Sequence, residues 1–93
     1  MISLKKNKKP IVVDLFAGAG GLSLGFEQAG FNVSCAIEYH IDAVKTYIEN
    51  RKKNQIKPEI INQDIRKING KTIFNKISKL HGNDINIDLI IGG

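Results

Sequence analysis

The sequence predicts an α/β fold on a parallel sheet, with its elements in the order β-α-β-α-β-α-β. Four short apolar runs rich in isoleucine and valine alternate with three segments of helical apolar spacing. The first apolar run leads directly into the glycine-rich stretch 14–22, after which a helical pattern begins. Such alternation implies right-handed crossovers between parallel strands. In a sheet of this kind, ligands bind at the carboxyl ends of the strands.

The composition indicates one small domain or part of one. The 93 residues are 42% hydrophobic and 25% charged, which is ordinary for a soluble globular protein. Neither a membrane span of roughly 20 apolar residues nor the apolar segment of a signal peptide is present in the sequence. The single cysteine, Cys35, excludes an internal disulfide and favours a reducing compartment.

The net charge of +5 is compatible with a polyanionic partner but does not require one. Lysines cluster in residues 5–9, so we expect residues 1–10 to form a flexible basic amino end and residues 11–93 to form the domain. A second basic cluster, residues 51–53, suits the negative end of a helix dipole and needs no further explanation.

The first strand and helix flank the glycine-rich stretch. Residues 11–16 form a nearly continuous apolar run, interrupted by Asp14, as expected of a strand covered on both faces. Residues 21–29 are predicted to be helical, and Gly30 stands where a glycine ends helices. The apolar residues that share one face of this helix are Leu22, Phe26 and Ala29.

The remaining elements follow in the same alternation. Strands are expected at 33–37, 60–61 and 87–91, helices at 41–51 and 71–80, and connections at 54–59, 68–70 and 81–84. The apolar face of the second helix comprises Ile41, Val44 and Ile48 with Tyr47 beside them, and that of the third comprises Ile73, Phe74, Ile77 and Leu80. We expect the fourth strand to be buried. A buried strand followed by Gly92 and Gly93 is a poor domain end, which predicts a fragment.

Three acidic residues are expected at the carboxyl edge of the sheet: Asp14, Glu38 and Asp64. A carboxylate that ends the second strand can accept hydrogen bonds from both hydroxyls of a ribose, which assigns that role to Glu38. Asp64 can accept a hydrogen bond from an adenine amino group. Phe16 and Tyr39 offer flat surfaces for a purine. Together these residues predict a nucleoside site.

Each of these residues also has a simpler interpretation. Asp64 is as well suited to capping a helix, and Phe16 alone fits the core better than a ligand contact. Cys35 lies within a strand and is expected to be an inert core residue. His40 and His81 lack metal-ligand spacing and are expected at the surface. No metal site is predicted.

The glycine pattern favours S-adenosylmethionine over a dinucleotide. A dinucleotide fingerprint needs glycine or alanine at position 23, which is Ser23, and there is no Gly-Lys-Ser/Thr of a P-loop. A ligand with adenosine and a small amino-acid tail fits better. The tail carboxylate suits the amino end of the helix that begins near Gly21, where free N–H groups favour an anion.

Residues 14–31, DLFAGAGGLSLGFEQAGF, resemble the first motif of the DNA (cytosine-5) methyltransferases. Residues 36–39, with Ala43 and Tyr47, resemble the second motif, Asp64-Ile65 the third, and residues 88–93 the start of the fourth. The resemblance covers about residues 11–93. It implies the amino-terminal half of a Rossmann-like, S-adenosylmethionine-dependent methyltransferase fold.

The resemblance also implies roles for the site residues. The backbone around the glycines contacts the methionine part, Phe16 and Tyr39 flank the adenine, Glu38 binds the ribose and Asp64 holds the adenine amino group. The cofactor-binding residues implied in this way are Phe16, Ala17, Gly18, Gly20, Gly21, Leu22, Glu38, Tyr39, Asp64 and Ile65.

The implied activity is methylation of carbon 5 of cytosine in duplex DNA, in the cytoplasm of a bacterium at the nucleoid and within a restriction–modification system. In the family a proline-cysteine element follows the two glycines, and that cysteine attacks carbon 6 of a flipped cytosine. The chain lacks this element and Cys35 does not match it, so the fragment is expected to be inactive. The alternatives are a non-catalytic subunit of a split methyltransferase, a nicotinamide-dependent oxidoreductase domain and a tRNA-methylating family member.

Overall fold

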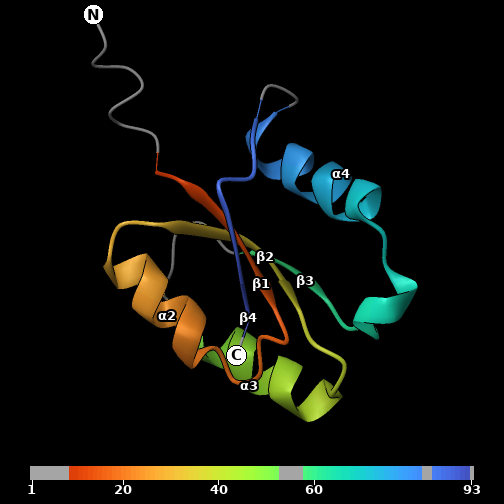
Figure 1. Ribbon diagram of the computed structural model, residues 1–93. Helices are drawn as coiled ribbons and strands as arrows, with labels where there is room; N and C mark the ends of the chain where they lie inside the picture. The colour runs from red at the N-terminus through yellow and green to blue at the C-terminus, as the bar shows by residue number, and fades with distance from the viewer. Residues whose placement is uncertain (1–8, 53–57, 83–84, 93) are drawn as a thin grey trace, which may run out of the picture.

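Four parallel strands form a single sheet in the order β3-β2-β1-β4 (Figure 1). The computed structural model describes residues 9–52, 58–82 and 85–92. Its elements are β1 (Ile11–Leu15), α2 (Gly21–Gln28), β2 (Asn32–Ile37), α3 (Ile41–Asn50), β3 (Glu59–Ile61), the 3₁₀ helix η1 (Ile65–Lys67), α4 (Gly70–His81) and β4 (Leu89–Gly92). The predicted α/β fold and the alternation of strands and helices are confirmed.

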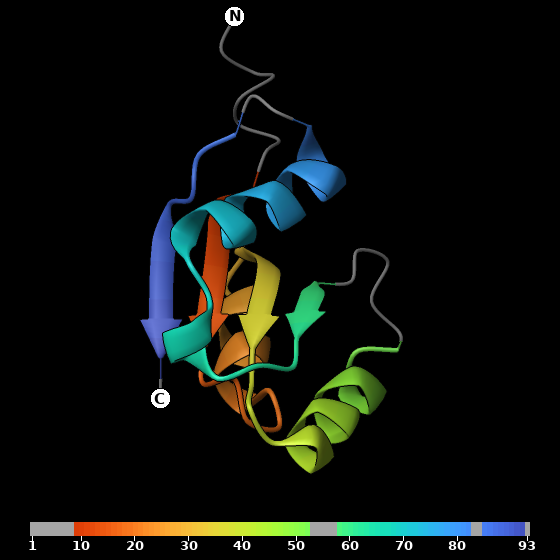
Figure 2. The same ribbon diagram turned by 90° about the vertical axis from the view of Figure 1, so that its right-hand side faces the viewer.

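The helices cover the two faces of the sheet unequally. Helix α4 lies on one face, whereas α2 and α3 lie on the other (Figure 1). All four strands run the same way, so their carboxyl ends meet at one edge (Figure 2). The chain crosses from β2 and β3 on one side of β1 to β4 on the other. Ligands of open α/β sheets bind outside the carboxyl ends at such a reversal of strand order.

The core consists of two clusters of buried side chains. The larger cluster lies between the sheet and α4 and is built on Val13, Cys35, Ile37 and Ile77. Burial raises the pKa of the Cys35 thiol to about 11, which suits the predicted core position of this residue. The smaller cluster lies on the opposite face of the sheet and comprises Ala17, Ala36 and Tyr47.

The predicted apolar faces of the helices are only partly buried. Leu22 of α2 and its C-cap residue Ala29 are exposed, and the buried residue of α2 is Ser23. In α3, Val44 and Tyr47 are buried, whereas Ile41 and Ile48 remain exposed; in α4 the exposed apolar residues are Phe74 and Leu80. Helical spacing shows which residues share a face, but the partner packed against the helix decides which face is buried.

The prediction of a buried fourth strand is wrong. β4 is an edge strand that pairs with β1 alone, and Ile90 is 60% exposed. The apolar residues just before β4, Ile85 and Ile87, instead pack against the larger core cluster.

Several boundaries also differ from the expectation. β1 ends at Leu15, which leaves Phe16 in the following turn. Helix α4 begins at Gly70, because the Asn69 side chain caps it by accepting a hydrogen bond from the Thr72 N–H at 2.9 Å. η1 was not predicted. Three expected segments lie partly outside the described residues: the amino end at 1–8, the connection 54–59 at 54–57, and the loop 81–84 at 83–84.

Two polar residues are more buried than their sequence context indicates. Arg51, expected as part of a basic cluster at the end of a helix, is 2% exposed, and its Nη2 lies 3.0 Å from Glu27 Oε1. His81 is half-buried, with Nε2 2.9 Å from the Oγ of buried Ser34. His40 is exposed, as expected, and Lys53 lies outside the described residues.

Candidate functional site

The glycine-rich segment forms a tight turn at the carboxyl end of β1. Phe16, Gly18 and Gly20 all have positive φ angles, of 54°, 58° and 97°. Two backbone hydrogen bonds hold the turn: the Ala17 N–H donates to the Ile37 carbonyl at 2.9 Å, and the Gly20 N–H donates to the Ala17 carbonyl at 3.1 Å. The turn is thereby joined to β2 before α2 begins.

Phe16 combines a strained backbone with an exposed aromatic ring. A left-handed φ is unusual for a bulky residue and costs about 1–3 kcal/mol. The side chain gains little from packing in return, because Phe16 is 58% exposed. A Cβ added at Gly92, at the end of β4, would lie 3.8 Å from the Phe16 ring, so the ring stands beside the carboxyl ends of β1 and β4. The strained backbone thus holds the exposed ring at this edge of the sheet.

Glu38 connects the glycine turn to the loop after β2. Its Oε1 accepts a hydrogen bond from the Gly18 N–H at 2.7 Å, and its Oε2 accepts one from the His40 N–H at 2.9 Å. The His40 bond, followed by the Gly18 bond, lowers the pKa of Glu38, so the carboxylate is ionised at neutral pH. Each oxygen keeps a second lone pair with which it can accept a further hydrogen bond.

Tyr39 lies next to this carboxylate in sequence and is 64% exposed. Its ring meets the His40 ring edge to face at 5.4 Å. The Asn62 side chain holds the loop by donating to the carbonyls of Glu38 and Tyr39 at 3.0 and 2.8 Å. Sequence reasoning did not single out Asn62. Its position directly after β3 was the available signal, since carboxyl-end residues of parallel strands share one edge.

Asp64 caps η1, as its simpler interpretation predicted. Its Oδ1 accepts from the Arg66 N–H at 2.9 Å, and its Oδ2 lies 2.6 Å from Arg66 Nη2. These bonds with Arg66 lower the pKa of Asp64 to about 2. Ile65, the neighbour of Asp64, packs against the larger core cluster.

Asp14 does not reach the surface of the site, contrary to the expected convergence of three carboxylates. It is 1% exposed and accepts a hydrogen bond from the Ser23 hydroxyl beneath the turn. Burial raises the pKa of this carboxyl. The acidic groups at the edge itself are therefore Glu38 and Asp64.

The amino end of α2 is open to an anion. Its N-cap residue is Gly20, which has no side chain, and its first turn contains no acidic residue. The first N–H groups of a helix have no partner within the helix and carry the positive end of its dipole. Gly21 has open space where a Cβ would stand.

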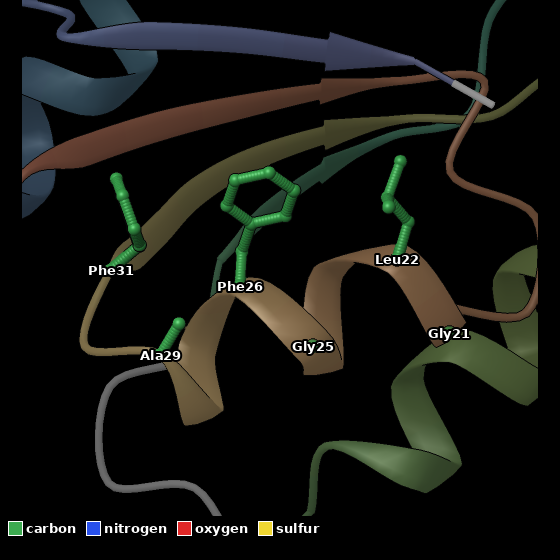
Figure 3. Close-up of a pocket in the computed structure, with 6 residues that line it drawn as sticks. All are labelled: Gly21, Leu22, Gly25, Phe26, Ala29 and Phe31. Carbon is green, nitrogen blue, oxygen red and sulfur yellow. The ribbon is translucent and has the colours of Figure 1, made fainter.

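An apolar hollow of about 240 Å³ lies along α2, away from Glu38 and Tyr39. Figure 3 shows Leu22, Phe26 and Phe31 pointing the same way, towards the strands. The hollow is lined by Gly21, Leu22, Gly25, Phe26, Ala29 and Phe31. The apolar residues of α2 that remain exposed, such as Leu22, line this hollow. The hollow contributes no polar group to the edge of the sheet.

The described ranges contain neither a group of three or more potential metal ligands nor a helix long and apolar enough to cross a membrane.

Comparison with known proteins identifies the family. The family model for C-5 cytosine-specific DNA methylases matches residues 11–93. The chain belongs to this family.

The curated relatives are bacterial type II methyltransferases. M.HindV of Haemophilus influenzae is 44% identical over 81 residues, which are 87% of this chain and 23% of that protein. M.XorII of Xanthomonas oryzae pv. oryzae is 40% identical over 85 residues, 91% of this chain and 18% of that protein. The chain thus spans about a fifth of the length of these methylases.

Solved structures agree with the family. A prophage-encoded protein of Escherichia coli, described as a DNA modification methyltransferase, superposes with a TM-score of 0.73 at 36% identity, covering 91% of this chain and 22% of that one. The ribosomal protein L11 methylase of Lactobacillus delbrueckii shares the fold at 16% identity, with a TM-score of 0.56, covering 98% of this chain and 54% of that one. The methylase chain therefore has the Rossmann-like methyltransferase fold that its sequence motifs imply.

Proposed function

We propose that the chain binds S-adenosylmethionine at the carboxyl edge of its sheet, for methylation of carbon 5 of cytosine in duplex DNA. The observation that carries this proposal is Phe16, an exposed aromatic ring on a left-handed backbone beside the glycine turn. Family membership supplies the class of reaction, and the geometry supplies a surface for the cofactor.

The adenosine part fits the residues after β1 and β2. Phe16 and Tyr39 offer exposed ring faces for the adenine. The free lone pairs of the Glu38 carboxylate accept hydrogen bonds from the ribose hydroxyls, because its backbone donors use one lone pair on each oxygen. Asp64 receives the adenine amino group in place of the exposed Arg66 side chain, whose Nε and Nη2 otherwise donate to its carboxylate oxygens.

The amino-acid tail fits the glycine turn. The uncapped amino end of α2 receives the methionine carboxylate, and the open space at Gly18 and Gly21, where a Cβ would stand, lets the ligand approach the backbone, whereas Gly20 leaves room for the Tyr47 ring. Ala17 and Leu22 flank the glycines and form the rest of the proposed surface for the amino-acid tail. Leu22 borders both the turn and the hollow along α2.

The bound cofactor supplies an electrophilic methyl group on a sulfonium ion. The nucleophile that makes carbon 5 of cytosine reactive is a cysteine thiolate in this family. Cys35 is not that nucleophile, since it is fully buried in β2 with a thiol pKa raised to about 11. In our proposal the nucleophile comes from a proline-cysteine element outside these 93 residues. The type II relatives support a restriction–modification setting.

Calorimetric titration of the 93-residue chain with S-adenosylmethionine, S-adenosylhomocysteine and NAD tests the cofactor assignment. We expect one site for each of the first two ligands and no heat for NAD. Binding of NAD without S-adenosylmethionine would instead favour an oxidoreductase domain. In a protein that carries both this chain and the cysteine, transfer of a labelled methyl group to duplex DNA but not to tRNA tests the substrate.

A further inference from the structure

A buried chain of hydroxyl and carboxyl groups lies directly beneath the glycine turn. The Tyr47 hydroxyl of α3 donates to Ser23 Oγ of α2 at 3.0 Å, and the Ser23 hydroxyl donates to the Asp14 carboxylate of β1. All three side chains are at most 1% exposed. The hydrogen bonds thus connect three elements in the interior. Because Ser23 bonds to both Asp14 and Tyr47, α2 turns the face that carries Ser23 inward, and its predicted apolar face is not the buried one.

The Tyr47 ring also forms the floor of the turn. A Cβ added at Gly20 would lie 2.8 Å from Tyr47 Cδ2, a distance that real Cβ atoms do not show. The guanidinium carbon of Arg51 lies 4.8 Å from the centre of the same ring. One helical turn along α3 from Tyr47, the Asn50 side chain donates to the Ala19 carbonyl at 3.2 Å. Helix α3 therefore contacts two consecutive residues of the glycine turn.

We propose that Tyr47 and Asn50 are positioning residues, through which α3 sets the placement of the glycine turn for the cofactor. This inference rests on the proposed S-adenosylmethionine site. The Tyr47 hydroxyl, held through Ser23 by Asp14, fixes the ring under Gly20, and Asn50 holds the carbonyl of the preceding residue, Ala19. With these two contacts in place, the Gly18 N–H points at Glu38 and the amino end of α2 faces the ligand.

Two variants isolate the contacts with little change in shape. Tyr47→Phe removes the hydroxyl and keeps the ring, and Asn50→Ala removes the donor to Ala19. Ile77→Val is the matched control, because Ile77 is fully buried in α4, in the core cluster on the face of the sheet opposite Tyr47. It lowers stability without changing the turn.

Two measurements on the full 93-residue chain separate positioning from stability. The first is the dissociation constant for S-adenosylhomocysteine, measured well below each variant's melting temperature. We expect Tyr47→Phe and Asn50→Ala to weaken binding about 2- to 10-fold, the equivalent of one hydrogen bond, and Ile77→Val to leave it unchanged. The second, which needs no ligand, is hydrogen exchange at the Ala17, Gly18 and Gly20 amides. We expect both site variants to accelerate this exchange more than Ile77→Val does at equal global stability.

The outcomes distinguish the inference from the function on which it rests. If the unmodified chain binds no S-adenosylhomocysteine, the proposed function fails, and amide exchange alone decides whether α3 holds the turn. If the unmodified chain binds and the two site variants match Ile77→Val in both measurements, the positioning role is overturned and the binding function stands.

Discussion

The carboxylate of Glu38 accepts a hydrogen bond from the backbone N–H of Gly18 at 2.7 Å, across twenty residues of sequence. The carboxylate that we assign to the ribose therefore also holds the turn that we assign to the amino-acid tail. His40 occupies the second oxygen in the same way, at 2.9 Å. In our proposal, cofactor binding and the local structure of the turn both depend on the Glu38 side chain. Four predictions test this dependence and the strain in the turn.

Glu38→Gln replaces one acceptor oxygen with an amide that faces a backbone N–H donor. We expect binding of S-adenosylmethionine to weaken by about 1–3 kcal/mol, the range for hydrogen bonds to charged groups. Calorimetry on Glu38→Gln and on Glu49→Gln measures this effect. Glu49 is an exposed carboxylate of α3 that pairs with Lys52, so its variant controls for the loss of one charge. An unchanged dissociation constant in Glu38→Gln would remove the ribose role.

Acid should destabilise the chain through Glu38. Its pKa in the folded state is lowered from the usual 4.5, chiefly by the His40 N–H, so its contribution to stability is complete above that value and is lost as the pH falls through the lowered pKa. Asp14, whose pKa burial raises, acts in the opposite sense, since the folded state favours its protonated form.

Urea denaturation of the unmodified chain and Glu38→Gln between about pH 3 and 6 separates these two groups. Because Asp14 is present in both proteins and the Glu38 charge is the smallest of the influences on its pKa, the difference in unfolding free energy reports chiefly Glu38. We expect this difference to be largest at pH 6 and to shrink towards pH 3. A difference that grows on acidification would show that Glu38 is not held as the ionised acceptor.

Substitutions of Phe16 test whether its left-handed backbone lowers stability and whether its ring contributes to cofactor binding. Phe16→Ala and Phe16→Gly both remove the exposed ring, but only glycine tolerates a φ of 54° without strain. We expect Phe16→Gly to be about 1 kcal/mol more stable than Phe16→Ala by urea denaturation. Both variants should bind S-adenosylmethionine more weakly than the unmodified chain, and to a similar extent. Equal stability of the two variants would argue against a left-handed backbone at this position.

Gly20 and Gly25 differ in the space that an added side chain would find, and alanine at the two positions should therefore have opposite effects on stability. Gly20→Ala combines a φ of 97° with a Cβ 2.8 Å from the Tyr47 ring, so we expect a loss of about 2–4 kcal/mol. Gly25 lies inside α2 with nothing within 4 Å of an added Cβ, and Gly25→Ala should stabilise by about 0.5–1 kcal/mol. Thermal melts of both variants measure the contrast. A tolerated Gly20→Ala would mean that Tyr47 does not pack under the turn.

Much of the fold was predictable because it depends on local patterns. Alternating apolar runs and helical spacing predicted the strands, the helices and their parallel arrangement, and Gly30 ends α2 at a left-handed φ of 99° as expected. The position of Glu38 at the end of β2 placed it at the edge of the sheet beside Gly18 before any contact was known. These features depend only on the sequence of one element or of two neighbouring elements, so they can be predicted without knowledge of distant contacts.

Other features depend on contacts between distant residues. Asp14 is equivalent to Glu38 by position along its strand, yet it lies beneath the turn, bonded to Ser23 and through Ser23 to Tyr47 of two other elements. Arg51 follows α3 as a basic residue suited to a helix end, yet it packs on Tyr47 and pairs with Glu27.

The sequence by itself determined the order of the elements and the edge at which the candidate site lies, because periodicity and spacing act along the chain. The family rests on the motifs that resemble it and on the family model that matches residues 11–93. The tertiary structure decided which face of each helix is buried, that Asp14 lies beneath the turn and that Phe16 carries strain. The physical reason is that burial depends on what packs against a residue. Here those partners lie nine to 77 residues away, as the bonds from Ser23 to Asp14 and from Ile11 to Asp88 illustrate.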